Sequence, residues 1–158
     1  MAATITLSSI IKQLTRDYPR YRFQTGDVFS WSYHSQTITY IDEESPAAIA
    51  QLLHETAHAI LGHRHYTRDI DLITIERQAW EVAIHQLAPR YNIILTMDDD
   101  VVQDALDTYR QWLHARSICP TCGAVGIETA KHHYHCLLCA SNWRVNEARS
   151  CELRRYRT

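Results

Sequence analysis

Residues 54–58 have the sequence His-Glu-Thr-Ala-His, an H-E-x-x-H motif inside a largely apolar stretch. No Gly or Pro interrupts the chain from Ala47 to Leu61, which predicts a helix. Because residues four apart share one face of a helix, His54 and His58 could bind one metal ion. Glu55 lies beside them, where it could act on a metal-bound water. The motif therefore predicts a zinc hydrolase, and most often a peptidase.

The segments before the motif predict a helix and a β-hairpin. Apolar residues at helical spacing favour an amphipathic helix over residues 8–18, which Pro19 should end. Two β-branched and aromatic stretches, 28–33 and 37–41, have a possible turn between them and predict a hairpin. The Ser-Pro pair at 45–46 has the residue types preferred at the N-cap and first position of the motif helix.

Two further helices are predicted after the motif. Apolar residues recur at helical spacing from Asp71 to Leu87, and Pro89 should end that helix. Another helix is predicted to start after Thr96 and to end at about Arg116, and three Asp residues at 98–100 suit its N-terminus. Beyond Ser117 the residues become small and turn-forming, so we expect a first domain over residues 1–117.

A catalytic zinc site usually has three protein ligands and one open position, so a third ligand must follow the motif. Gly62 and His65 are each displaced by one residue from the pattern H-E-x-x-H-x-x-G-x-x-H. One residue turns a helix by about 100°, so this pattern is not met. Glu76 is the preferred ligand, because it lies 18 residues after His58 on a second predicted helix with small residues one and two turns further on. The competing candidates are Glu81, Asp69, Asp71 and His65.

Three segments of the chain resemble the ImmA/IrrE metallopeptidases: 53–63, 76–83 and 87–89. Members of that family carry an H-E-x-x-H helix, followed by a helix of pattern E-x-x-A-x-x-x-A that leads to Leu-x-Pro. The chain has Glu76-Arg77-Gln78-Ala79-Trp80-Glu81-Val82-Ala83 and then Leu87-Ala88-Pro89. It departs from many members at Trp80-Glu81-Val82, where they have Asn and Phe before the Ala. The resemblance covers about residues 5–115.

This resemblance implies an α+β fold, with a mainly helical zincin-like core and a small N-terminal β-hairpin. It implies that His54, His58 and Glu76 bind a catalytic zinc ion, and that Glu55 is the general base for peptide hydrolysis. Such proteases typically cleave a helix-turn-helix transcriptional repressor, and the exposed edge of the hairpin could pair with an extended substrate. The residue that would stabilise the oxyanion stays open among Tyr66, His65 and His85.

Four cysteines form two C-x-x-C pairs separated by 13 residues: Cys119, Cys122, Cys136 and Cys139. Each pair can form a tight knuckle, and two knuckles give a closed site of four thiolates around one ion. We therefore predict a zinc ribbon over residues 118–145, in which zinc folds the module and does no chemistry. Tyr134 and Trp143 should pack around it, whereas three nearby histidines are expected on its surface or strands: His132, His133 and His135.

The 158-residue chain has a net charge of −2, but its last residues are basic. Residues 143–158 contain two Glu and five Arg, the latter being Arg144, Arg149, Arg154, Arg155 and Arg157. We treat 146–158 as a basic tail that could contact an acidic partner or nucleic acid. Neither a signal sequence nor a membrane span is evident, so a cytoplasmic protein without a membrane partner is predicted. Five cysteines in such a protein favour metal binding over disulfides, and Cys151 should be a free thiol.

Two alternatives to an ImmA/IrrE-type peptidase compete. One is a SprT-like protease that acts on DNA-associated proteins, in which the third zinc ligand is His rather than Glu. The other is a non-catalytic adaptor whose ribbon binds protein or nucleic acid. The preferred prediction is a zinc endopeptidase that holds two zinc ions, one catalytic and one structural, and that acts on a protein substrate.

Overall fold

The computed structural model describes residues 4–148 and 151–158, which form a mixed α+β fold with two small sheets. The chain divides into two compact units, Met1–Arg64 with Glu76–Gln103, and His65–Ile75 with Asp104–Thr158. Within the described residues, no helix is both long and apolar enough to cross a lipid bilayer. The domain bounds expected from the sequence stay a prediction.

In the first unit, helix α1 (Leu7–Asp17) is the amphipathic helix predicted near the N-terminus. Its first turn is capped twice. The Thr6 side chain accepts a hydrogen bond from a backbone N–H of the helix, and the Glu44 carboxylate accepts one from the Leu7 N–H at 2.8 Å. Three side chains at helical spacing are fully buried: Leu7, Ile10 and Leu14. Burial of this stripe fixes α1 against the rest of the unit.

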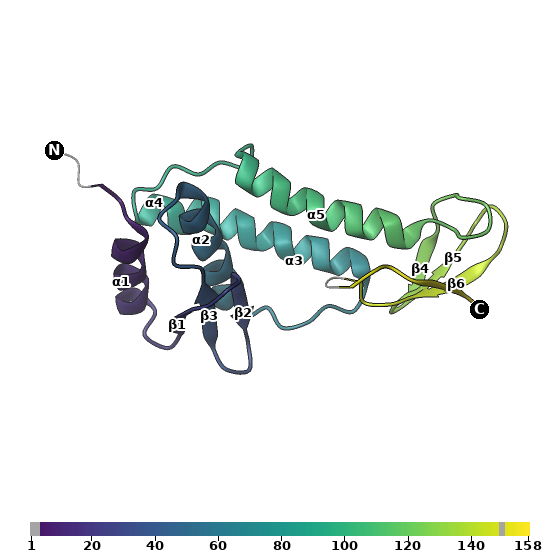
Figure 1. Ribbon diagram of the computed structural model, residues 1–158, viewed down its shortest axis with the longest axis horizontal. Helices are drawn as coiled ribbons and strands as arrows, with labels where there is room; N and C mark the ends of the chain where they lie inside the picture. The colour runs from purple at the N-terminus through teal and green to yellow at the C-terminus, as the bar shows by residue number, and fades with distance from the viewer. Residues whose placement is uncertain (1–3, 149–150) are drawn as a thin grey trace. The chain divides into compact units, whose positions relative to one another are not determined.

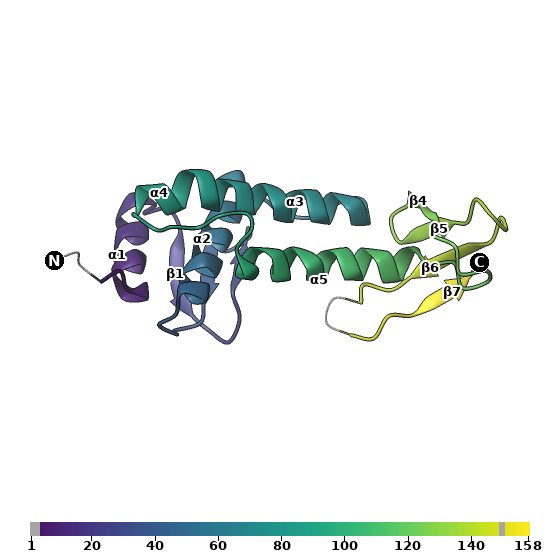
Figure 2. The ribbon, with the colours of Figure 1, turned by 90° about the horizontal axis from the view of Figure 1, so that it is seen from above.

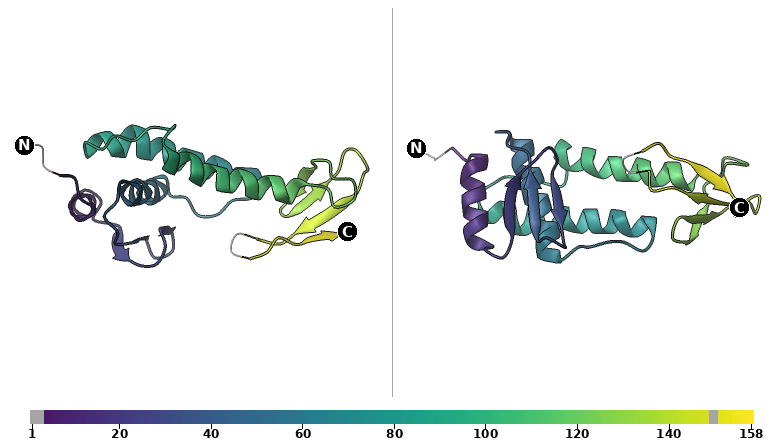
Figure 3. Two further views of the ribbon diagram at one scale, coloured as in Figure 1. Left: turned by 45° about the horizontal axis from the view of Figure 1, so that its top comes forward. Right: turned by 60° about the horizontal axis from the view of Figure 1, so that its bottom comes forward.

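The sheet of the first unit has three strands in the order β1-β3-β2, with β3 in the middle (Figure 1; the same sheet from other sides in Figure 3). Strands β2 (Ser30–Ser32) and β3 (Thr37–Tyr40) are antiparallel and confirm the predicted hairpin. Strand β1 (Arg22–Thr25) runs parallel to β3 and was not predicted. Its four residues are mostly exposed, so they lack the alternating apolar pattern that signals a strand.

Helix α2 (Pro46–Leu61) carries the H-E-x-x-H motif, with Ser45 as its N-cap as predicted. It ends at Gly62, whose φ of 68° is left-handed and therefore suits glycine. Two aromatic side chains, Tyr21 and Trp31, form hydrogen bonds to the backbone at the C-terminal end of α2. The Tyr21 hydroxyl donates to the Ala59 carbonyl at 2.9 Å, and the Trp31 indole N–H donates to the His63 carbonyl at 2.8 Å. These bonds fix the last turn of α2 and the residue that follows Gly62.

The second predicted helix continues further than its sequence suggested. Helix α3 (Asp69–Val82) passes into a π-helical turn, η1 (Ala83–Leu87), and then into α4 (Ala88–Arg90). The prediction that Pro89 ends the helix near Leu87 is wrong. The Ala88 N–H bonds to the carbonyl of Ala83, five residues back, and Pro89 occupies the first turn of α4, where its missing N–H is tolerated.

Helix α5 (Asp100–Ser117) matches the last predicted helix, and the ribbon sheet follows it in the second unit. This sheet has four strands in the order β4-β5-β6-β7, which are labelled in Figure 2. They are β4 (Ile127–Ala130), β5 (His133–His135), β6 (Asn142–Val145) and β7 (Arg155–Arg157). The last strand uses residues expected in a basic tail, because its backbone completes the pairing of β6. Arg149 of that tail lies outside the described residues.

A buried ion pair anchors the ribbon to the helical residues of the second unit. Asp69 and Arg116 are both fully buried, and the Arg116 Nε lies 2.8 Å from Asp69 Oδ2. The Tyr134 hydroxyl donates to the same oxygen at 2.6 Å, and the Trp143 indole N–H donates to the Arg116 carbonyl at 3.0 Å. Tyr134 and Trp143 stack on each other, so they form the expected aromatic core of the ribbon.

Candidate metal centres

Two groups of side chains in the described residues could hold a metal ion. The first consists of His54 and His58 on α2 and Glu76 on α3. The Nε2 atoms of His54 and His58 lie 3.1 Å apart. The Glu76 carboxylate reaches His54 Nε2 at 3.0 Å and His58 Nε2 at 3.4 Å. All three side chains are buried, so the structure brings together the three ligand candidates that the sequence preferred.

The orientation of the His54 ring follows from its packing. Residues four apart on α2 place the two imidazoles on one face, and their rings meet edge to face with centroids 4.5 Å apart. Trp80, one turn beyond Glu76 on α3, stacks on His54 with centroids 4.2 Å apart and an interplanar angle of 23°. The large indole leaves the His54 ring little room to turn away from Glu76.

The electrostatics of this group suit a divalent cation. Burial lowers the pKa of His54 to about 4, although the neighbouring Glu76 opposes this shift. Burial by itself would raise the pKa of Glu76, but hydrogen bonds from His54 and His58 outweigh it and hold that pKa well below its usual range. At neutral pH His54 is neutral and Glu76 is ionised, which are the states that metal binding requires.

The donor set itself fits zinc. Two imidazole nitrogens and one carboxylate oxygen form one of the three-ligand sets found in catalytic zinc sites, with a fourth position left for water or substrate. Oxygen-only sites suit magnesium or calcium instead. The chemistry of His54, His58 and Glu76 is therefore compatible with zinc.

His63 belongs to this centre, although sequence reasoning missed it. Its Nδ1 lies 2.8 Å from the Nδ1 of His58. With a metal ion on Nε2 of His58, Nδ1 would carry the proton and donate to His63. The left-handed Gly62 reverses the chain here, and the His63 N–H bonds to the His58 carbonyl at 3.1 Å. The sequence did offer one signal for this contact, a His directly after the Gly that ends the motif helix.

The competing ligand candidates have other partners and lie outside the group. Glu81 pairs with Arg77, Asp71 with Arg68, and the buried Asp69 with Arg116. Of the suggested oxyanion partners, Tyr66 donates to the Glu147 carboxylate, and His65 and His85 are exposed. Glu55 is half-buried on α2, next to His54.

The second group consists of the four cysteines of the predicted ribbon, whose Sγ atoms lie close together. Cys119 and Cys139 are 3.6 Å apart, and Cys122 and Cys136 are 3.5 Å apart. A tetrahedral site with zinc–sulfur bonds of about 2.3 Å has edges of about 3.8 Å, close to these separations. All five cysteines are free thiols, and the exposed Cys151 lies outside the group.

The two knuckles of this group have matching backbone geometry. The Gly123 N–H bonds to the Cys119 carbonyl, and the Ala140 N–H bonds to the Cys136 carbonyl, each at 2.9 Å. Gly123 and Ala140 both have a left-handed φ, 76° and 61° respectively. Burial would raise the pKa of Cys119, but backbone N–H groups of its knuckle outweigh it and lower that pKa to about 6. At Cys122 the backbone N–H of Ala124 acts in the same direction, but burial and the neighbouring thiols outweigh it and raise that pKa to about 12, so in this knuckle the thiolate is favoured at Cys119.

No protein-family model, curated protein or solved structure matches the chain. The chemistry of the two centres is therefore the guide to function.

Proposed function

We propose that this protein is a zinc-dependent endopeptidase with a structural zinc ribbon. The observation that carries this proposal is the convergence of His54, His58 and Glu76, with Glu55 next to the first histidine. Glu55 directly follows the ligand candidate His54 on α2 and is half-buried. The combination of a three-ligand set and an adjacent acid is typical of metallopeptidases.

In this proposal, different residues bind the metal ion, orient its ligands and transfer the proton. His54, His58 and Glu76 would hold the ion, and the bond from His58 to His63 would fix one imidazole in its ligating orientation. Bound zinc lowers the pKa of water toward neutrality and polarises a carbonyl group. Glu55 would accept a proton from the attacking water and deliver it to the nitrogen of the leaving amine.

The sheet of the first unit supports a peptide substrate. Among the described strands, β2 pairs with β3 only, so one of its edges is available for pairing. An extended peptide could add to that edge through backbone hydrogen bonds. Trp31 of β2 donates to the His63 carbonyl, which ties this edge to the end of the metal-binding helix. A peptide on β2 would therefore lie on an element fixed to the site.

The resemblance to ImmA/IrrE metallopeptidases adds a substrate class to the proposal, a helix-turn-helix transcriptional repressor. The carboxylate of Glu76 in the ligand group favours this family over SprT-like proteases, whose third ligand is a histidine. A repressor encoded beside this chain is the first substrate to test.

The decisive variant is Glu55→Gln, which removes the proton acceptor and keeps the size of the side chain. We expect cleavage of the purified repressor to fall by at least about 100-fold, because general-base catalysis contributes about that much or more. Zinc content, measured by mass spectrometry, should stay at about two ions per chain by ligand counting. The exposed Glu43→Gln is the matched control. Undiminished cleavage by Glu55→Gln would refute the proposal, and about one zinc per chain would favour the adaptor.

A further inference from the structure

The ribbon sheet has an exposed face that the peptidase proposal does not use. Residues paired directly across antiparallel strands point to the same side of a sheet. The register places His133, Arg144 and Tyr156 in one row across β5, β6 and β7. A second row joins Ile127, His135 and Asn142 across β4, β5 and β6. We call these six residues the outer face of the ribbon sheet.

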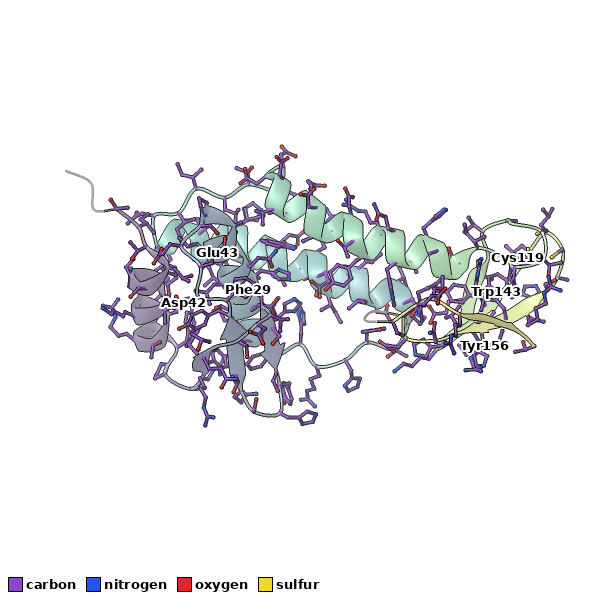
Figure 4. All side chains as sticks on the ribbon, in the orientation of Figure 1. Phe29, Asp42, Glu43, Cys119, Trp143 and Tyr156 are labelled. Carbon is purple, nitrogen blue, oxygen red and sulfur yellow. The ribbon has the colours of Figure 1, made fainter. Side chains whose placement is uncertain are left out.

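The two sides of the sheet differ sharply in burial. On the inner side, Tyr134 and Trp143 are almost fully buried. On the outer face, five of the six residues are exposed and His135 is half-buried. The strand register places Tyr156 of β7 on the outer face and Trp143 of β6 on the inner side; both residues are labelled in Figure 4. The outer face is therefore solvent-facing within its unit.

Charge on the outer face has one sign. Arg144 is its permanently charged member, two members are histidines, and no carboxylate is among the six residues. Glu128 of β4 points to the inner side, where it accepts a hydrogen bond from the Asp69 N–H. Two further arginines of the same sheet, Arg155 and Arg157, pair with the inner-side residues Val145 and Trp143, so Arg144 is the arginine of the outer face. Such a surface complements a polyanion.

The outer face also carries a stacking platform. The Arg144 guanidinium lies over the Tyr156 ring, 4.6 Å from its centroid, and Tyr156 is 40% exposed. The Nδ1 atoms of His133 and His135 bond to the Lys131 carbonyl and to Asn142 Oδ1, each at 2.9 Å. These bonds fix both rings, so each offers its Nε2 to a ligand.

We propose that the outer face of the ribbon sheet binds single-stranded DNA. Tyr156 would stack on an unpaired base, Arg144 would contact a phosphate, and the histidine Nε2 atoms would accept hydrogen bonds from N–H groups of the bases. A flat sheet face with a stacking ring suits unpaired bases, because a duplex hides the faces of its bases. Ile127 is 49% exposed on the same face and offers an apolar contact for the methyl group of thymine, which RNA lacks. This site does not depend on the peptidase activity.

The test is fluorescence anisotropy of the full-length, zinc-loaded protein with a labelled oligothymidine of about 15 nucleotides. Tyr156→Ala should weaken binding by at least about fivefold, because stacking on an aromatic ring contributes at least that much per base. Tyr156→Phe should bind like the wild type, because the stacking ring is kept. Arg144→Ala should lower the slope of log affinity against log salt by about 0.7, the value for one phosphate contact on a single strand.

A second Arg–Tyr pair supplies the matched control. Arg64 lies over the Tyr33 ring, 4.2 Å from its centroid, in the other unit. Arg64→Ala and Tyr33→Ala should leave DNA binding unchanged, which separates a specific face from loss of any Arg–Tyr pair. Thermal melting and zinc content of each variant report whether the ribbon remains folded.

Four outcomes would overturn the proposal. They are no binding by the wild type at about 50 mM salt, tighter binding of duplex than of single strand, wild-type affinity in Tyr156→Ala, and binding of oligouridine but not of oligothymidine. Because the measurement is binding, a protein that binds DNA but cleaves nothing would sink only the peptidase proposal.

Discussion

The hydrogen bond between His58 and His63 allows a quantitative prediction about metal affinity. The proposed variant is His63→Phe, which fills a similar volume but removes the acceptor for the His58 Nδ1–H at 2.8 Å. The backbone of residue 63 should stay in place, because the Trp31 indole bonds to its carbonyl rather than to its side chain. The variant therefore isolates the contribution of one imidazole acceptor.

The size of the effect follows from the burial of this pair. A buried donor that loses its acceptor costs about 1–3 kcal/mol, and outer partners of metal-ligating histidines contribute about 10–100-fold to metal affinity. His58 is buried, but His63 is half-buried, so water can replace part of the lost bond. We expect a loss at the lower end of this range, about tenfold, or about 1.4 kcal/mol.

The assay is a cobalt titration of the metal-free protein in competition with a chromophoric chelator. Cobalt at the four-cysteine site gives intense thiolate charge-transfer absorption, whereas the histidine–carboxylate site gives weak bands, so the ribbon is an internal reference. His63→Gln supplies an amide oxygen as acceptor and should recover most of the affinity. The exposed His65→Phe is the control and should have no effect. Wild-type affinity in His63→Phe, or an equal loss in His65→Phe, would show that His63 does not orient the ligand.

Two further predictions concern stability. Because burial lowers the pKa of His54 to about 4 from an ordinary value of 6.5, its contribution to the stability of the metal-free protein is complete above pH 6.5 and is lost as pH falls toward 4. The free energy of unfolding in urea should thus drop by about 2 kcal/mol between about pH 7.5 and pH 5, and a His54→Asn variant that kept the same drop would contradict this assignment. In the second unit, Arg116→Met leaves Asp69 as an uncompensated buried charge and should cost about 3–5 kcal/mol. The exposed Arg110–Asp107 pair is the control, since its loss should cost less than about 1 kcal/mol, and a similar cost at both sites would rule out burial as the cause.

Local patterns in the sequence were enough to predict most of the helices. Ser45 and Pro46 marked the start of α2, and the absence of Gly and Pro marked its length. The alternation of β-branched and aromatic residues indicated the β2–β3 hairpin. These signals are local because helix caps, turn residues and side-chain periodicity act within a few residues of the chain.

Elements that depend on distant partners were missed or misread. Strand β1 has no apolar pattern of its own and exists because β3 offers a parallel partner. Arg155–Arg157 looked like a solvated tail, yet its backbone pairs with β6. Pro89 seemed to end a helix, but the π-helical turn before it lets the chain remain helical. For the two strands the deciding contact is a distant strand, whereas for Pro89 it is the local bond from the Ala88 N–H to the Ala83 carbonyl, five residues back.

The sequence by itself determined the residue types of both metal centres and the spacing within each motif. The positions of His54 and His58 on one helix face follow from helical geometry, and each C-x-x-C pair predicts a knuckle. Only the tertiary structure decided which of several acids meets the histidines, because Glu76 reaches them through the packing of α3 against α2, while Asp69 pairs with Arg116 instead. It also decided the part of His63, since the reversal at Gly62 returns that ring to His58. A ligand set is a property of positions in space, and the one-dimensional pattern fixes those positions only within a single turn of a helix.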